Sequence, residues 1–194
     1  MLVEMTGTVQ IRPHTLNKGV GKAIVRQLGK TYADTVVPGV GLVVAIHKVT
    51  STEDALIHPG KGGTVQYSVV FDAIVFRAVK NDILRASIVE VDPTRGVRLS
   101  LGFFEDIFVS PDLLPKPSLW SEAHKTWAFN AEPDPDAEPD LHPLEVGAPV
   151  FALVVQDHFF DIHKIDPELE VPPTRPYCIL GSMQGNGLGP VDWW

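Results

Sequence analysis

The spacing of apolar residues predicts a strand, a helix and a further strand system in the first fifty residues. Residues 2–12 alternate imperfectly between apolar and polar positions, which is typical of a strand. From 16 to 32, apolar residues recur at every fourth position, which is the period of an amphipathic helix. Residues 35–50 are rich in β-branched residues, and the pair Gly39 and Gly41 predicts a sharp bend or bulge among them.

The rest of the chain is predicted to be mostly strands. Turns rich in Gly, Asp and Pro separate short runs that recur about every ten residues, as in a small antiparallel barrel or sandwich. The predicted strands cover 65–79, 83–91, 97–101, 103–109, 149–155 and 177–183. The chain is therefore expected to be α+β, with an N-terminal α+β part and a small antiparallel barrel or sandwich at about 67–194.

One stretch breaks the pattern of strands. Residues 131–143 hold five acids, four prolines and one bulky apolar residue, so they have little surface to bury. We therefore expect an acidic, proline-rich insertion at about 131–145 that is a disordered or extended loop.

Charge is distributed unevenly along the chain. The formal net charge is −8, which argues against the wrapping of duplex DNA by this chain alone. Residues 1–64 nevertheless contain seven Lys and Arg against four acids, whereas residues 120–170 contain two against twelve. The helix 16–32 has a basic face, for which a solvated surface is favoured over nucleic-acid contact; its cations are Lys18, Lys22, Arg26 and Lys30.

Composition excludes several classes of protein. No run approaches the roughly 18 apolar residues of a membrane helix, and the first residues do not read as a signal peptide. Cys178 is the one cysteine, so there can be no internal disulfide, which fits a reducing compartment. The thiol lies in an apolar strand and is interpreted as buried and inert.

A carboxylate–imidazole cluster is the best candidate for a metal site. It comprises Asp157, His158, Asp161 and His163. Such ligands bind Zn or Fe, but the spacing matches no known ligand set. We therefore expect no metal, no cofactor and no catalytic residues.

The barrel strands carry a more coherent signal, which is contact with single-stranded nucleic acid. Arg85 lies on the side of strand 83–91 away from its apolar residues, and Arg98 and Ser100 lie likewise on strand 97–101. Three further cations near strand ends complete the candidate RNA-binding set: Arg77, Lys80 and Arg95. Cations with nearby rings suit phosphates and stacked bases, and the rings here are Phe103, Phe104 and Phe108. The alternative is that the rings are core and the arginines only solubilise the surface.

Two motifs resemble those of a known family. The segment SLGFFEDIFVSP at 100–111 and the ending GLGPVDWW at 187–194 resemble the larger stalk subunit of eukaryotic RNA polymerase III. Upstream segments, including VVPGVGLVVAIHKV at 36–49 and VFDAIVFRAVKNDIL at 70–84, look like the N-terminal part of that family. The resemblance covers nearly the whole chain in order and is weakest over 112–176. The related stalk subunits of polymerase II and of archaea share the layout.

The resemblance implies a non-catalytic subunit of a nuclear polymerase. An N-terminal α+β tip domain at 1–66 would anchor it to the polymerase core and pair with the smaller stalk subunit. A C-terminal OB-type barrel at 67–194 would meet emerging RNA, and no membrane association is implied. A free-standing OB-type protein that binds single-stranded RNA is the alternative. An enzyme built on the 157–163 cluster is a further alternative that metal analysis would test.

Overall fold

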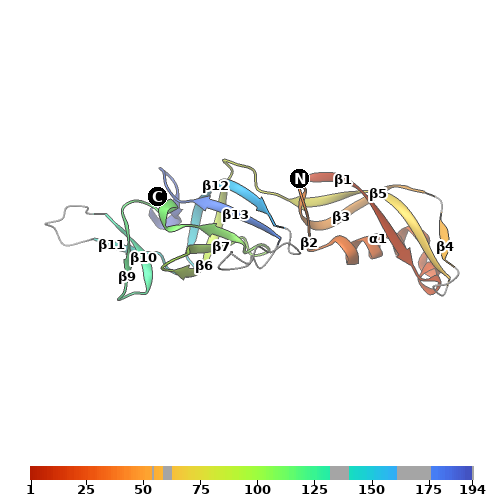
Figure 1. The fold of residues 1–194 in the computed structure, drawn as a ribbon, viewed down its shortest axis with the longest axis horizontal. Helices are drawn as coiled ribbons and strands as arrows, with labels where there is room; N and C mark the ends of the chain where they lie inside the picture. Colours follow the sequence, from red (N-terminus) through yellow and green to blue (C-terminus); the bar gives the residue numbers. More distant parts are fainter. Residues whose placement is uncertain (54, 59–62, 132–139, 161–175, 194) are drawn as a thin grey trace. The chain divides into compact units, whose positions relative to one another are not determined.

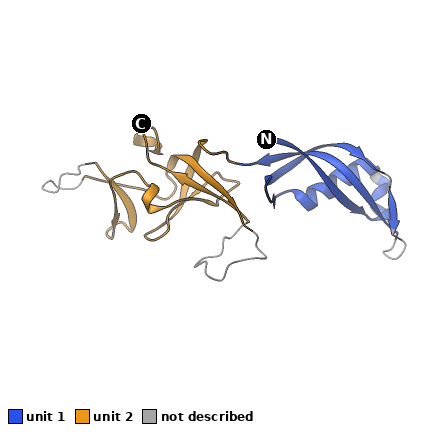
Figure 2. Ribbon diagram, turned by 45° about the horizontal axis from the view of Figure 1, so that its top comes forward, with its two compact units in different colours: residues 1–77 blue, residues 78–194 orange. Residues whose placement is uncertain are grey.

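The computed structural model describes residues 1–53, 55–58, 63–131, 140–160 and 176–193. The chain divides into two compact units, Met1–Arg77 and Ala78–Trp194 (Figure 2). The division expected at 66/67 falls inside a long strand that belongs entirely to the first unit. Among the described residues, no helix has the length and apolar character required to cross a membrane.

The first unit is one sheet with a single long helix against it (Figure 1). Its strands follow the order β1-β5-β3-β2, and β4 also pairs with β5. The elements in sequence are β1 (Leu2–Ile11), η1 (Pro13–Lys18), α1 (Val20–Tyr32), β2 (Thr35–Val37), β3 (Gly41–Thr52), β4 (Leu56–His58) and β5 (Thr64–Phe76). β5 is central, because β1 and β3 pair along its two sides.

The helix begins later than its apolar period suggests. Pro13 opens a 3-10 helix, and Gly19 with φ of 93° separates this from α1. A positive φ is readily adopted by glycine and ends the regular turn there. Further on, the predicted bend is the β2–β3 hairpin turn, in which the amide of Val40 donates to the carbonyl of Val37 at 3.0 Å.

Among the described residues of this unit, one face of the sheet is covered, and α1 covers it. Ile24 and Leu28 of α1 are buried in a cluster with Val9, Val43 and Phe71 of the strands. Each such side chain contributes about 1.5–3 kcal/mol through burial. The opposite face leaves apolar side chains exposed: Leu2 at 59 %, Val44 at 48 % and Ile74 at 42 %.

The second unit is built on a closed five-stranded barrel. Its strands are β6 (Ile83–Asp92), β7 (Gly96–Ser100), β8 (Ile107–Val109), β12 (Pro149–Phe159) and β13 (Tyr177–Ser182). The order β13-β8-β7-β6-β12 is closed by a β12–β13 pairing. β8 and β13 run parallel, whereas the other pairs are antiparallel. Numbered in chain order, the strands neighbour each other as 1-2-3-5-4-1, which is the OB topology expected from the sequence.

A small sheet interrupts the barrel between its third and fourth strands. It has the order β11-β10-β9, with β9 (Ser118–Ser121), β10 (Thr126–Asn130) and β11 (Leu141–Pro143). Short helices η3 (Pro111–Leu113) and η5 (Val191–Trp193) and the two-residue strand β14 (Gly189–Pro190) complete the unit.

The acidic insertion is only partly a loop. Residues 132–139 lie outside the described residues. Residues 141–143, however, form β11, which pairs with the edge of β10. The expectation of a loop over the whole of 131–143 is therefore wrong at its end, because backbone pairing with β10, the strand that precedes the insertion, offsets the unfavourable composition.

Candidate nucleic-acid interface

The outer face of β7 and β8 carries a cation beside an aromatic ring. Arg98 of β7 lies opposite Phe108 of β8 in the antiparallel register. Both residues are half-buried, while their neighbours Val97, Leu99 and Ile107 are fully buried in the barrel. In OB folds the second and third strands form the face that binds oligonucleotides, and β7 and β8 are those strands here.

Arg98 already forms an ion pair with the carboxylate of Glu90. The guanidinium Nη2 lies 2.9 Å from Glu90 Oε2 on β6. The two face each other because β6 has a register shift between Ile88 and Glu90, which brings Glu90 to the outer side. The Nε atom of Arg98 is buried, with no hydrogen-bond partner among the described residues. Glu90 therefore competes with any phosphate for this cation, although an ion pair this exposed is worth only about 0–1 kcal/mol.

The turn between β6 and β7 presents Arg95 to solvent. Asp92 Oδ1 accepts the backbone N–H groups of Thr94 and Arg95, both at 2.8 Å. These bonds favour the carboxylate and lower the pKa of Asp92, the bond from Arg95 most. The indole of Trp127 donates to the carbonyl oxygen of Asp92 at 3.0 Å. Arg95 thus extends into solvent from a turn whose first residue, Asp92, is held by three hydrogen bonds.

Arg85 lies on the outer side of β6, but at a distance from Arg98. It is exposed and stands opposite Phe151 of β12. Five residues of strand, or about 16 Å, separate it from Glu90, the cross-strand partner of Arg98. Lys80 precedes β6 and is exposed. The structure therefore forms two arginine–phenylalanine pairs on the barrel rather than one continuous patch.

Arg77 is the member of the predicted set that lies in the first unit. Its Nη1 donates to the carbonyl oxygen of Gly39 in the β2–β3 turn at 2.8 Å. This bond links the end of the sheet to its hairpin, so a structural contact already occupies the side chain.

The predicted aromatic residues divide between core and surface. Phe104 is fully buried, with its ring centroid 5.5 Å from that of Tyr177, so it is core. Phe103 is 54 % exposed and Phe108 half-buried. Sequence reasoning missed Phe151, since only the β6–β12 register places it beside Arg85. Ser100, predicted to point outward, is buried, and its Oγ accepts the amide N–H of Gly102 at 2.9 Å.

The described residues give no support to the predicted metal site at 157–163 or to a reactive cysteine. Asp157 and His158 lie on β12, while Asp161 and His163 fall outside the described residues. No three metal-ligating side chains gather in the described part of the chain. Burial, with the nearby charge of Asp106, raises the pKa of the Cys178 thiol to about 11. The thiol is half-buried rather than fully buried as predicted, and its raised pKa keeps it protonated at neutral pH.

The closed five-stranded barrel defines the second unit as an OB-type barrel, and a sheet-and-helix unit precedes it. Comparison with known families finds a match for each of the two units. Residues 82–194 match the family described as RNA polymerase III subunit Rpc25. Residues 6–62 match the SHS2 domain found in the N terminus of Rpb7p, Rpc25p and MJ0397. The chain belongs to the RNA polymerase III subunit Rpc25 family.

Relatives match along the full length. The chain is 34 % identical over 203 residues to DNA-directed RNA polymerase III subunit RPC8 of Bos taurus, covering 100 % of this chain and 98 % of the relative. It is 25 % identical over 218 residues to the RPC8 subunit of Saccharomyces cerevisiae, covering 100 % and 99 %. The archaeal subunit Rpo7 of Saccharolobus solfataricus is 27 % identical over 101 residues, covering 52 % of this chain and 55 % of the relative.

The family resemblance seen in the sequence is thus confirmed, as is the α+β class with an OB-type barrel. The family is that of a non-catalytic subunit of a DNA-directed RNA polymerase. The expectation that the chain is not an enzyme in its own right is confirmed with it.

Proposed function

We propose that this chain is the larger stalk subunit of nuclear RNA polymerase III, forms a heterodimer with the smaller stalk subunit and supports transcription initiation. The first unit docks on the partner and the polymerase core, and the barrel contacts emerging RNA. The observation that carries the proposal is the full-length similarity to RPC8 subunits, which spans both units rather than the barrel alone.

The exposed apolar face of the first sheet is evidence that a partner protein binds there. Leu2 stands opposite Ile74 across the β1–β5 pairing, and Val44 lies at the register shift of β3 beside the same stretch of β5. These three side chains are all more than 40 % exposed. A contiguous exposed apolar surface on one sheet face marks an interaction site. We infer that a protein partner covers this face.

Co-expression with the small stalk subunit tests the heterodimer. We expect a higher soluble yield and one complex near 1:1. Ile74→Lys places a charge in the apolar face and should abolish the complex, whereas Val146→Lys changes an equally apolar residue, 67 % exposed, on the second unit and should not. A stable monomer that ignores the small subunit would contradict the proposal, and so would equal effects of the two variants.

RNA contact is tested by fluorescence anisotropy with a labelled single strand at several salt concentrations. We expect affinity no better than about micromolar, because the chain is acidic overall. Changing Arg85 and Arg98 to alanine should weaken binding and flatten the log–log salt slope by about 1.4, if each cation neutralises one phosphate. The control, Lys116→Ala with Lys125→Ala, removes two exposed cations away from the barrel strands. An unchanged slope in the arginine variant would place the RNA elsewhere.

A free-standing RNA-binding protein is the alternative, favoured by the self-contained closed barrel. The two arginine–phenylalanine pairs would serve it equally well. A pull-down from native extract separates the two functions. Co-purification of the large polymerase subunits supports the stalk subunit, and recovery of the chain without them supports the alternative.

A further inference from the structure

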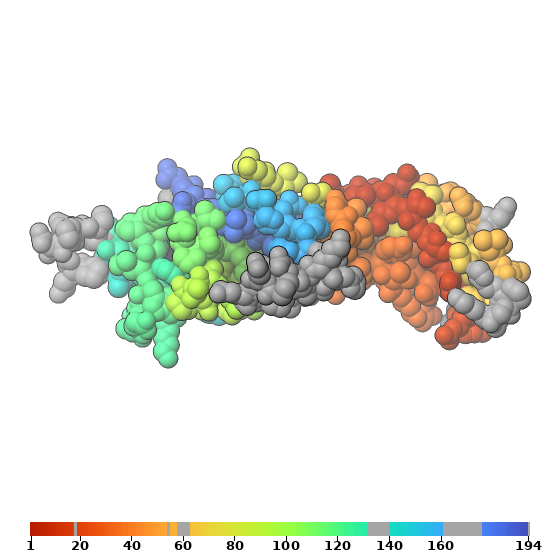
Figure 3. Space-filling model, in the orientation of Figure 1, coloured from red at the N-terminus to blue at the C-terminus, as the bar shows by residue number. Residues whose placement is uncertain are grey.

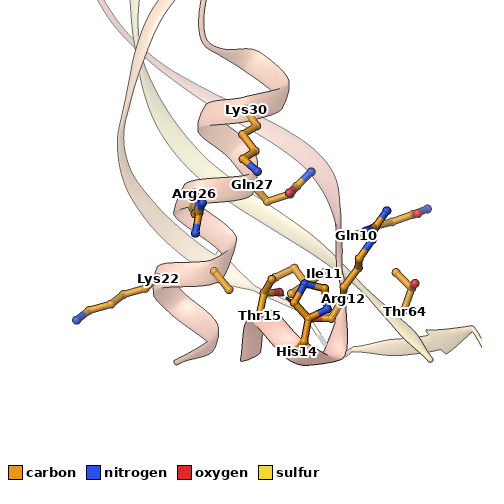
Figure 4. Close-up of a pocket in the computed structure, with 11 residues that line it drawn as sticks. Gln10, Ile11, Arg12, His14, Thr15, Lys22, Arg26, Gln27, Lys30 and Thr64 are labelled. Carbon is orange, nitrogen blue, oxygen red and sulfur yellow. Dashed lines mark hydrogen bonds between the residues drawn. The ribbon is translucent and has the colours of Figure 1, made fainter. Parts of the chain in front are cut away.

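A groove of about 990 Å³ lies on the first unit, between α1 and the end of β1 (Figure 4). The helix contributes Lys22, Arg26, Gln27 and Lys30 to one side, and the other side comprises the end of β1, the start of η1 and Thr64. β1 and α1, red and orange in the space-filling view, both contribute to the surface of this unit (Figure 3). All the residues that line the groove belong to the first unit.

The groove is strongly basic. Its lining holds the cations Arg12, Lys22, Arg26 and Lys30, together with His14, and no acidic residue is among the described residues that line it. Lys22, Arg26 and Lys30 form no ion pair with any described residue. They recur at every fourth position of the helix and so extend over about 12 Å along its axis. Such a concentration of like charge, in a chain of net charge −8, calls for an anionic ligand with repeated charges.

The strand side of the groove favours a peptide over a nucleic acid. β1 is the edge strand of the sheet, and within the described residues only β5 pairs with it. An edge strand offers backbone N–H and C=O groups to an extended peptide. Proteins that bind single-stranded nucleic acid combine a basic groove with aromatic rings on which bases stack, and no ring of Phe, Tyr or Trp lines this groove.

The spacing of charges also fits an extended peptide. In a strand, side chains on one face recur every two residues, or about 6.6–6.8 Å. The cations of α1 recur about every 6 Å. We propose that this groove binds an acidic protein segment in extended conformation, with carboxylates at alternate positions facing α1 and its backbone along the edge of β1.

The test uses the full chain and a fluorescein-labelled peptide of alternating Glu and Thr, ten residues long. Lys22→Glu with Arg26→Glu reverses two cations of the groove. An acid in the first helical turn is favoured by the helix dipole, and the like-charge pair at i and i+4 is kept, so the fold should survive. We expect peptide affinity to fall about tenfold. Circular dichroism checks that α1 is intact.

Two controls make the result specific. Lys116→Glu with Lys125→Glu makes the same charge change on the second unit and should leave peptide binding within about twofold. A peptide of alternating Gln and Thr should not bind. Equal binding by parent and groove variant overturns the proposal. It is also overturned if ten-residue oligouridylate, rather than the acidic peptide, loses affinity for the groove variant, since the ligand is then a nucleic acid.

Discussion

At the scale of single residues, Gly96 shows how closely the barrel is packed around its first turn. Its φ is +88°, and a Cβ at this position would lie 2.1 Å from the carbonyl oxygen of Val109 on β8. Gly102 has nearly the same φ, +89°, but open space around it. The two glycines therefore separate the cost of backbone conformation from the cost of a clash.

We expect Gly102→Ala to lower the free energy of unfolding by about 1–2 kcal/mol, the cost of left-handed backbone for alanine. Gly96→Ala should cost at least about 2 kcal/mol more, because β7 and β8 must move apart. Urea denaturation of both variants measures the difference. Equal destabilisation would show that β8 yields without cost at this point.

Cys178 provides a prediction about pH. Because its pKa in the folded chain is raised to about 11, the thiolate is scarce at pH 8, and iodoacetamide should react far more slowly than with the urea-unfolded chain. As pH rises above the ordinary thiol pKa of 9.0, the unfolded state loses its thiol proton first, so this group destabilises the fold progressively up to about pH 11. The cysteine-free variant Cys178→Ala should lack this component. A fast reaction of the folded chain at pH 8 would contradict the assignment.

Strand alternation in the sequence predicts which side of a strand each candidate residue occupies, but not which residue lies opposite it on the next strand. Alternation placed Arg85 and Arg98 outside the barrel, where they are found. The partners of both depend on register between strands. The shift between Ile88 and Glu90 brings a carboxylate to Arg98, and no local pattern reveals a shift of one residue.

At the scale of elements, the sequence indicated the long strands and the helix and missed the short strands. β9, β10 and β11 have three to five residues each and no clear alternation. They exist because each pairs with a neighbour and because Leu144 and Ala128 are buried beside them. Such pairing and burial outweigh the local propensity of these residues.

We expect one part of the acidic insertion to be dispensable for the stability of the fold and another part to contribute to it. Replacing 132–139 by eight Gly and Ser residues keeps the loop length, so we expect the free energy of unfolding to change by less than about 0.5 kcal/mol. Replacing 131–143 in the same way also removes β11 and its pairing with β10. This second change should cost about 1–3 kcal/mol. Thermal unfolding of the two variants measures both values, and equal midpoints would show that β11 adds nothing.

At the scale of the whole molecule, the position of the domain boundary depends on β5. The predicted boundary at 66/67 separates most of β5 from β1 and β3, although these strands pair with it along nearly its full length. The sequence could not show this, because a strand of 13 residues carries no local sign of which unit supplies its partners.

Fragments test the boundary. We expect residues 78–194 to fold alone, since the barrel closes on itself. Fragment 1–77 should show sheet structure, whereas 1–66 lacks the centre of its sheet and should be unfolded. Far-UV circular dichroism and limited proteolysis distinguish them. A folded 1–66 fragment would mean that β5 is not required for the first unit.

The parallel pairing of β8 with β13 has a consequence for how the protein is made. A ribosome delivers the chain in order, and the first unit has all its strands once β5 has emerged. The barrel, in contrast, cannot close until its last strand has been synthesised, because Ile107 of β8 pairs with Ile179 of β13. Domains that finish early fold first during synthesis. The nascent chain therefore presents a finished first unit, ready to meet a partner, while its barrel is still an open sheet with two unpaired edges.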